Sequence, residues 1–285
     1  MKLALGTAQF GLDYGISNKS GKTNVTEIER ILSYCKKNNV GLIDTAYAYG
    51  DSEHRLGMFE HLSDFDIVTK LPLEVVKSGS VHEYFNESLR RLGVNHVSTY
   101  MLHNSAILSS SKGDKIYNEM LRLKNEGFID KVGCSVYTSQ ELDSLIERYD
   151  FDVFQVPFSP FDQEILNSKY INNRKQIEIH VRSIFLQGLY FISIDDIHPY
   201  FEPVKDKILK YREILNCNNF SVQEFIYGFL KSYDSILSYI LLAVENEEQL
   251  KENIDFYRSS KPLDIDYSVF DFGDNAFRKA NSWKL

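Results

Sequence analysis

Four side chains whose types suit acid–base chemistry occur between residues 44 and 103 of the chain: Asp44, Tyr49, Lys70 and His103. A tyrosine with a pKa of about 10 is too weak an acid to protonate an alkoxide quickly at neutral pH. Lys70 could lower the pKa of Tyr49, and Asp44 could hold Lys70 charged and in place. His103 could donate a hydrogen bond to a carbonyl oxygen. The set predicts reduction of a carbonyl by hydride transfer, with Tyr49 as the acid.

Each of these residues also has a purely structural explanation when it is considered alone. Asp44 could cap a loop, and Tyr49 is one of 18 tyrosines. Lys70 could extend from the end of an apolar strand to solvent. His103 could be a buried histidine with satisfied hydrogen bonds. The chemical interpretation therefore depends on the four residues meeting at the ends of neighbouring strands.

The remaining sequence predicts elements that would bring these residues together. Apolar runs alternate with helical periods, and this pattern predicts eight strands, each followed by a helix. The predicted strands are residues 3–7, 41–45, 65–71, 97–102, 131–136, 152–156, 178–184 and 236–243. The predicted helices are residues 24–39, 51–62, 80–93, 112–127, 139–148, 162–174, 221–232 and 246–257. Asn24, Ser80 and Ser221 each precede a Glu by three residues, which predicts capping boxes.

Strict alternation of strands and helices predicts a parallel sheet, and eight units in 285 residues predict an α/β fold of the (β/α)8 TIM-barrel type. A doubly wound sheet is disfavoured because GxGxxG is absent after the first strand. We expect a single domain over residues 1–285. Residues 188–219 form an inserted segment after strand seven, with an extra helix at 204–215, and residues 261–285 form a C-terminal surface tail near the barrel mouth.

Composition excludes several other classes of protein. The net charge of −8 argues against nucleic-acid binding, and no window approaches the length of a membrane span. The N-terminal apolar run is too short for a signal peptide. The chain has three widely spaced cysteines, Cys35, Cys134 and Cys217. An odd number at wide spacing does not suit a disulfide framework, so we expect packed thiols in a cytoplasmic protein. The chain contains neither an HxH nor an HExxH motif, so the sequence predicts no metal site. It does not indicate the oligomeric state.

Several segments resemble the aldo-keto reductase superfamily: LGTAQFG, IDTAYAYGDSEHRLG, VTKL, YMLHN, VGCSVY, FQVPFSPFD, VRSIFLQG and EEQLKENI. The resemblance runs from about residue 3 to residue 254, and IDTAxxYGxSExxLG is a quite specific part of it. It implies a metal-free barrel oxidoreductase that uses NADPH or NADH on a small carbonyl substrate. By position it implies a catalytic tetrad of Asp44, Tyr49, Lys70 and His103, with Tyr49 as the proton donor.

The same resemblance implies a set of cofactor-binding residues. Ser135 and Gln155 match contacts to the nicotinamide carboxamide, and Arg182 stands where an aromatic ring usually stacks on nicotinamide. The segment VRSIFLQG would line the pyrophosphate, and Asn253 matches a contact to adenine. The complete set is Thr7, Ser135, Gln155, Arg182, Ser183, Phe185, Gln187, Glu245, Gln249 and Asn253.

The nucleotide preference is open because the chain departs from the family pattern after the last strand. Family members that prefer NADPH carry Lys or Arg there, whereas this chain has Ala243 and Gln249 among Glu245, Glu247 and Glu248. A carboxylate repels a 2′-phosphate but accepts hydrogen bonds from a 2′-hydroxyl. The glutamates could equally be a solvated helix start that the helix dipole stabilises.

Two other functions stay open on the sequence alone. The chain could be a nucleotide-binding sensor or regulatory barrel with little turnover. It could also be a Schiff-base aldolase acting through Lys70, although that function leaves Ser135 and Gln155 unexplained. The substrate is not readable, but five aromatic residues could line its pocket: Tyr14, Tyr47, Phe158, Tyr190 and Phe191.

Overall fold

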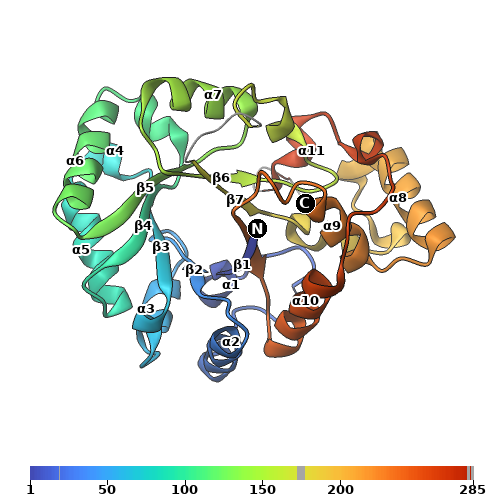
Figure 1. Ribbon diagram of the computed structural model, residues 1–285, viewed down its shortest axis with the longest axis horizontal. Helices are drawn as coiled ribbons and strands as arrows, with labels where there is room; N and C mark the ends of the chain where they lie inside the picture. The colour runs from blue at the N-terminus through green and yellow to red at the C-terminus, as the bar shows by residue number, and fades with distance from the viewer. Residues whose placement is uncertain (19, 172–176, 281–282, 284–285) are drawn as a thin grey trace.

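A closed barrel of eight parallel strands forms the centre of the protein (Figure 1), as the sequence predicts. The computed structural model describes residues 1–18, 20–171, 177–280 and 283. The strands are β1 (Lys2–Gly6), β2 (Leu42–Asp44), β3 (Asp66–Leu71), β4 (Val97–Leu102), β5 (Ile129–Ser135), β6 (Val153–Pro157), β7 (Glu178–Arg182) and β8 (Tyr239–Ala243). Each strand pairs with its neighbour in sequence, and β8 pairs with β1 to close the ring.

A layer of apolar side chains fills the barrel interior. It consists of Ala4, Leu42, Val68, Met101, Val153 and Leu241. On β5 the chain has Gly133 instead, because a Cβ there would lie only 2.9 Å from Met101 Cγ. The ring of His180 on β7 lies 4.9 Å from the ring of Tyr239, which packs against this layer. His180 therefore belongs to the packed interior of the barrel.

Helices surround the barrel (Figure 1), and their apolar side chains are buried in the hydrophobic core. Those that follow the strands are α2 (Val25–Lys37), α3 (Ser52–Gly57), α5 (Val81–Leu92), α6 (Gly113–Asn125), α7 (Ser139–Arg148), α9 (Val222–Lys231) and α10 (Glu247–Ser259). The side chains of Asn24 and Ser80 cap α2 and α5 by accepting a backbone N–H three residues on. Ser221 forms a complete capping box with Glu224 at the start of α9.

The predicted helix over residues 162–174 is wrong for the part that the structure describes. Ser159 and Asp162 exchange backbone hydrogen bonds in a tight turn, and a short 3₁₀ helix follows at Glu164–Asn167. The side chain of Gln163 donates hydrogen bonds to the carbonyl oxygens of Pro160 and Tyr267, and these contacts favour the turn over a helix. Residues 172–176 lie outside the described residues. The predicted helix over 51–62 is also shorter, since α3 ends at Gly57.

The inserted segment and the C-terminal segment pack together on one side of the barrel, where α8 (Lys205–Asn218), α9 and α11 (Asn275–Arg278) gather in Figure 1. The prediction of a surface tail is wrong for much of residues 261–280. Tyr267, Phe270 and Phe272 are buried, and the ring of Phe272 stacks on Phe161 at 4.5 Å. The tail therefore contributes to the hydrophobic core, while its position near the barrel mouth agrees with the prediction.

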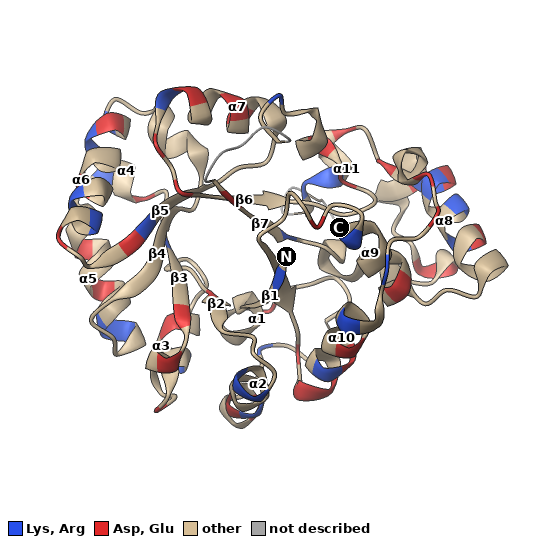
Figure 2. Ribbon diagram, viewed as in Figure 1, with Lys and Arg blue, Asp and Glu red and all other residues tan. Residues whose placement is uncertain are grey.

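Charged side chains of both signs are interspersed over the outer helices (Figure 2). Within the described residues, none of the helices combines the length and the apolar character that a bilayer span requires. All three cysteines are free thiols, and Cys35 and Cys134 are buried as expected. Cys217 is exposed near the end of α8, so the expectation of a packed thiol is wrong at that position.

Candidate active site

The predicted site residues gather because strand residues alternate between the inside and the outside of the barrel. Residues two positions after the interior apolar layer again face inward, one layer nearer the carboxyl ends of the strands. On the eight strands these positions hold Gly6, Asp44, Lys70, His103, Ser135, Gln155, Arg182 and Ala243. The dry interior layer thus supports a polar layer at the end of the barrel where TIM barrels place their chemistry.

Asp44 and Lys70 form a buried ion pair at the centre of this polar layer. Lys70 Nζ lies 2.6 Å from Asp44 Oδ1 and 2.8 Å from the carbonyl oxygen of Thr45. The second carboxylate oxygen of Asp44 accepts a hydrogen bond of 2.7 Å from Gln155 Nε2. Burial lowers the pKa of Lys70, and the adjacent Asp44 carboxylate acts in the opposite direction. Asp44 therefore holds Lys70 in place, as predicted.

The loop that carries Tyr49 is fixed by hydroxyl groups beneath it. Ser52 Oγ donates to the backbone oxygen of Thr7 at 2.9 Å and lies 3.1 Å from Thr45 Oγ1. The hydroxyl of Thr7 donates to the backbone oxygen of Asp44 at 3.0 Å. Thr7 therefore supports the loop, while a contact between Thr7 and a cofactor stays a prediction.

Two glycines allow the loop after β1 to touch the Tyr49 loop. A Cβ at Gly11 would lie 1.8 Å from the carbonyl oxygen of Tyr49. Gly50 has a φ of +57°, and a Cβ there would lie 2.3 Å from the carbonyl oxygen of Gly11. Only glycine fits this close backbone contact, which places the phenol of Tyr49 over the polar layer.

Tyr49 lies between Lys70 and His103. Lys70 Nζ is 5.1 Å from the centre of the Tyr49 ring, and the Tyr49 and His103 rings meet edge to face at 5.5 Å. Burial lowers the pKa of His103 to about 3, with smaller contributions from Lys70 and Arg182, so its imidazole is neutral at pH 7. A neutral imidazole has one N–H to donate and one nitrogen that accepts.

The pKa of Tyr49 is raised, which contradicts the expectation that Lys70 would lower it. Burial is the largest cause and the Asp44 carboxylate adds to it, while Arg182 acts in the opposite direction. In the resting site, burial and the Asp44 carboxylate therefore outweigh the cations near Tyr49. Tyr49 therefore carries its proton at neutral pH.

The environment of Lys70 also disfavours the Schiff-base aldolase. The Lys70 side chain has no exposed surface, and its ammonium group is engaged by Asp44 and the Thr45 carbonyl oxygen. The aldolase would need this amine to reach a substrate carbonyl, but Lys70 is buried within the polar layer and does not line the cavity above it.

A cavity of about 620 Å³ opens above the polar layer. Asp44, Tyr49 and His103 line it, together with all ten residues predicted to bind the cofactor: Thr7, Ser135, Gln155, Arg182, Ser183, Phe185, Gln187, Glu245, Gln249 and Asn253. Of the five aromatic residues proposed for a substrate pocket, Tyr14 and Phe191 line this cavity. Phe158 and Tyr190 are fully buried in the core, and Tyr47 packs on Arg91 at 4.1 Å.

The loop after β7 forms one wall of the cavity in an unusual backbone conformation. Ser183, Leu186 and Gln187 have φ between +44° and +59°, and Gly188 has a φ of +94°. The carbonyl oxygen of Gln187 accepts hydrogen bonds from the backbone of residues 16 and 17, so the loop after β1 lies against it. Left-handed residues turn successive backbone N–H groups toward a common point, an arrangement that binds anions.

The wall after β8 is acidic. Glu245 and Glu252 line the cavity there, and the described residues place no Lys or Arg beside them on this wall. Gln249 Oε1 accepts from the backbone N–H of Glu245 at 2.8 Å. Asn253 accepts from the Tyr227 hydroxyl and donates to the backbone oxygen of Gln249, which leaves one amide N–H for a ligand.

Sequence reasoning missed four residues near the site. Glu53 is buried behind Lys70 and accepts from Thr69 Oγ1 at 2.6 Å. Tyr137, Arg278 and Lys279 line the cavity. Tyr137 stands two residues after Ser135, so the alternation that selected Ser135 could have identified it. No periodic signal marks Arg278 or Lys279, because they belong to the irregular C-terminal segment.

The closed barrel and the cavity at the carboxyl ends of its strands define a (β/α)8-barrel protein with a polar site built on a buried Asp–Lys pair. The chain belongs to the aldo/keto reductase family, whose family model matches residues 2–267.

Named relatives agree with this membership over part of the sequence. The chain is 30% identical over 126 residues to an aldo-keto reductase of Mycobacterium tuberculosis, a match that spans 42% of this chain and 44% of that relative. The holo form of a Bacillus halodurans aldo-keto reductase superposes with a TM-score of 0.73 at 18% identity, covering 92% of this chain and 88% of the other.

A Bombyx mori aldo-keto reductase in complex with NADP gives a TM-score of 0.63 at 18% identity, covering 98% of this chain and 88% of the other. At these identities the structural likeness of the two solved proteins shows the fold alone. Together with the family match, it confirms the barrel and the resemblance that the sequence motifs indicate.

Proposed function

We propose that this protein is a nicotinamide-dependent oxidoreductase that reduces a carbonyl group to an alcohol. The observation that carries the proposal is the protonated Tyr49 phenol between His103 and the Asp44–Lys70 pair, at the floor of a large cavity. The resident cofactor supplies the hydride when it is bound. Family membership supports the same chemistry.

Each residue of the tetrad has a distinct role in the proposed reaction. Neutral His103 donates its N–H to the substrate carbonyl oxygen and holds that oxygen near Tyr49 Oη. The phenol of Tyr49 then donates its proton to this oxygen as negative charge develops there, because an alkoxide is a stronger base than a phenolate. Lys70 lies behind the Tyr49 ring and stabilises the phenolate that remains, and Asp44 keeps Lys70 charged.

The cavity suits a nicotinamide dinucleotide. Ser135 belongs to the polar layer and lines the cavity, so it can bind a carboxamide, while Gln155 already donates to Asp44 and keeps its amide oxygen for a ligand. The left-handed residues of the loop after β7, Ser183, Leu186, Gln187 and Gly188, suit the diphosphate. The acidic wall at Glu245 and Glu252 suits ribose hydroxyls and repels a 2′-phosphate, so we expect NADH to bind more tightly than NADPH.

The experiment that tests this function is a fluorescence titration of the purified protein with NADH and with NADPH, followed by an aldehyde-reduction assay. We expect binding of at least one nucleotide. The Tyr49→Phe variant should bind that nucleotide with unchanged affinity and lose about 10²- to 10⁴-fold in kcat, the range that general acid catalysis contributes. Failure of both nucleotides to bind at millimolar concentration would refute the oxidoreductase.

The same experiment addresses the sensor or regulatory barrel as the alternative function. Tight nucleotide binding without turnover of any aldehyde, in the wild type as in Tyr49→Phe, would favour the sensor. Cytoplasmic localisation and the absence of a nucleic-acid partner stay predictions from the sequence.

A further inference from the structure

We infer that the cavity takes a carbonyl substrate that carries a carboxylate or phosphate group, bound by Arg182 and Lys279 around the ring of Tyr137. This inference rests on the proposed function and adds the substrate class to it. All three residues line the cavity that contains Tyr49 and His103. Arg182 comes from the end of β7, Tyr137 follows β5, and Lys279 comes from the C-terminal segment.

Within the part of the chain that the structure describes, the guanidinium group of Arg182 has no anionic partner. Its carbon Cζ lies 4.4 Å from the centre of the Tyr137 ring. Nη1 makes one long hydrogen bond of 3.4 Å to Ser183 Oγ, and Nη2 is buried without a hydrogen-bond acceptor. Among the described residues, no carboxylate lies within ion-pair distance of Arg182. A buried donor without an acceptor is costly, and an anionic ligand would provide the missing acceptor at Nη2.

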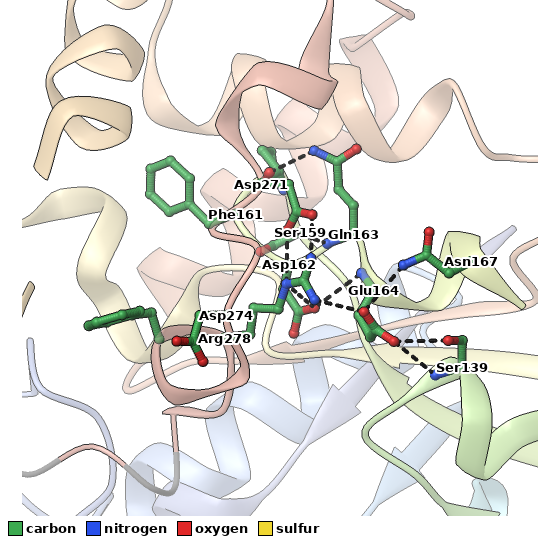
Figure 3. Close-up of polar contacts among 12 residues, drawn as sticks. Ser139, Ser159, Phe161, Asp162, Gln163, Glu164, Asn167, Asp271, Asp274 and Arg278 are labelled. Carbon is green, nitrogen blue, oxygen red and sulfur yellow. Dashed lines mark hydrogen bonds and ion pairs between the residues drawn. The ribbon is translucent and has the colours of Figure 1, made fainter. Parts of the chain in front are cut away.

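The carboxylates nearest to this end of the cavity are engaged elsewhere. Asp44 is paired with Lys70 and hydrogen-bonded to Gln155. A second group of acids surrounds Arg278, which Figure 3 shows pointing toward Asp162, Glu164 and Asp271. These acidic groups form ion pairs with Arg278 and none with Arg182, which acts on Asp162 only at longer range and opposes the rise in pKa that burial causes in that carboxyl group.

Arg278 fixes the C-terminal segment at the cavity. Its side chain is 6% exposed, and it donates to Glu164 Oε2 at 2.7 Å and to both carboxylate oxygens of Asp271. The Nε atom lies 3.9 Å from Asp162 Oδ1. Because three carboxylates surround Arg278, its charge is already balanced, and we assign it the role of anchoring the next residue.

That next residue, Lys279, packs on the same ring as Arg182. Lys279 Nζ lies 5.3 Å from the centre of the Tyr137 ring. Two cations from elements almost 100 residues apart thus converge on one aromatic side chain at the cavity. Arginine and lysine together on a shared wall are typical of carboxylate and phosphate recognition.

The cationic wall is close enough to the proposed reaction centre to act on the same small molecule. Arg182 influences the protonation of both Tyr49 and His103, and it lowers the pKa of each. A short substrate can therefore place its carbonyl oxygen at Tyr49 and its anionic group at Arg182. The other anion expected in the cavity is the cofactor diphosphate, for which the Ser183–Gly188 backbone is available.

The test compares substrates that differ only in charge. The first pair is 4-oxobutanoate and its methyl ester, and the second is glyceraldehyde 3-phosphate and glyceraldehyde. The readout is the ratio of kcat/KM for the anionic member to that for the neutral member. We expect the wild type to favour the anionic member of at least one pair by roughly ten- to a hundredfold, the value of a hydrogen-bonded charged contact. The preferred pair distinguishes a carboxylate from a phosphate.

Variants assign this preference to individual residues. Arg182→Met should bring the ratio close to one, Arg182→Lys should retain part of it, and Lys279→Met should lower it by a smaller factor. The matched control is Arg148→Met, because Arg148 packs on Tyr149 at 5.1 Å away from the cavity and its loss should leave the ratio unchanged. Nucleotide affinity is measured for each variant, so that an effect on the cofactor diphosphate is recognised.

One measurement does not depend on the variants folding. In the wild type, added salt should lower kcat/KM for the anionic substrate and leave the neutral one unaffected. A wild-type ratio of one or less for both pairs, or an unchanged ratio in Arg182→Met, overturns the inference while the oxidoreductase stands. If Arg182→Met binds nucleotide more weakly but keeps the same ratio of kcat/KM values, Arg182 is assigned to the cofactor diphosphate and the inference is also overturned. Failure of the wild type to reduce any aldehyde removes the proposed function itself.

Discussion

Replacing Lys70 by Met tests whether the Asp44–Lys70 pair is as tightly buried as the structure indicates. The side chains of Lys70 and Asp44 are 0% and 3% exposed. After the substitution, the Asp44 carboxylate would keep only the hydrogen bond from Gln155 Nε2 in place of its charged partner. Leaving one member of a buried ion pair unpaired costs about 3–5 kcal/mol, so we expect a loss of this size in the free energy of unfolding.

The double variant Asp44→Asn/Lys70→Met should recover most of this loss. It removes both charges of the pair, and the Asn oxygen can still accept a hydrogen bond from Gln155. The single Asp44→Asn variant completes the cycle, because it leaves the Lys70 ammonium buried without its counterion. We expect the two single losses to sum to several kcal/mol more than the loss in the double variant, which measures the coupling between the two side chains.

The assay is urea unfolding at pH 8 and pH 5, followed by far-UV circular dichroism. The loss in Lys70→Met should shrink at pH 5, where a buried unpaired carboxyl group can take up a proton. The control is Lys205→Met, which breaks an exposed ion pair with Glu202 and should change stability by less than about 1 kcal/mol. A loss below about 1 kcal/mol in Lys70→Met, or strict additivity in the double variant, would refute the reasoning. Recovery of stability without recovery of aldehyde reduction would assign the pair to catalysis.

Two further predictions concern the tail anchor and the Tyr49 loop. Burial raises the pKa of Asp162 to about 7. Between about pH 4 and pH 7 the folded state therefore holds a proton that the unfolded state has released, so stability falls as the pH rises from about 4 to about 7. Asp162→Asn should therefore gain roughly 1–4 kcal/mol in the free energy of unfolding at pH 8 and little at pH 4, whereas Asp271→Asn should be destabilised at pH 8. Thermal unfolding at both pH values checks this. An equal effect of Asp162→Asn at the two pH values would contradict it. Gly11→Ala places a Cβ 1.8 Å from the Tyr49 carbonyl oxygen and should lower kcat/KM about 100-fold. The control is Gly41→Ala, which has open space around it and should change kcat/KM little. Equal kcat/KM values for the two alanine variants would count against the close backbone contact.

Much of the barrel could be predicted from sequence because its strands are local apolar runs with clear boundaries. Val97–Leu102 and Ser139–Arg148 agree with the prediction to the residue. Period-two alternation explains why Asp44, Lys70 and His103 belong to one layer. These signals depend on neighbours in sequence and on parallel pairing, and both are readable from one chain.

The errors arise where distant segments decide the local structure. Residues 162–174 have a helix-compatible pattern, but Gln163 and Glu164 instead bind the C-terminal segment through Tyr267 and Arg278. No local pattern in residues 261–280 indicates that the tail is buried. The direction of the Tyr49 pKa shift was also wrong, because it depends on the balance of burial, Asp44 and Arg182, and burial is not a local property of sequence.

The pairing of β1 with β8 has a consequence for how the protein reaches its folded state. Every other strand pair joins neighbours in the chain, but this pair joins Lys2 to Tyr239. The closing contact therefore requires the largest loop entropy of any strand pair and should form late during folding. Until it forms, β1 and β8 are free edges that can pair with other chains, so crowded refolding favours aggregation over ring closure.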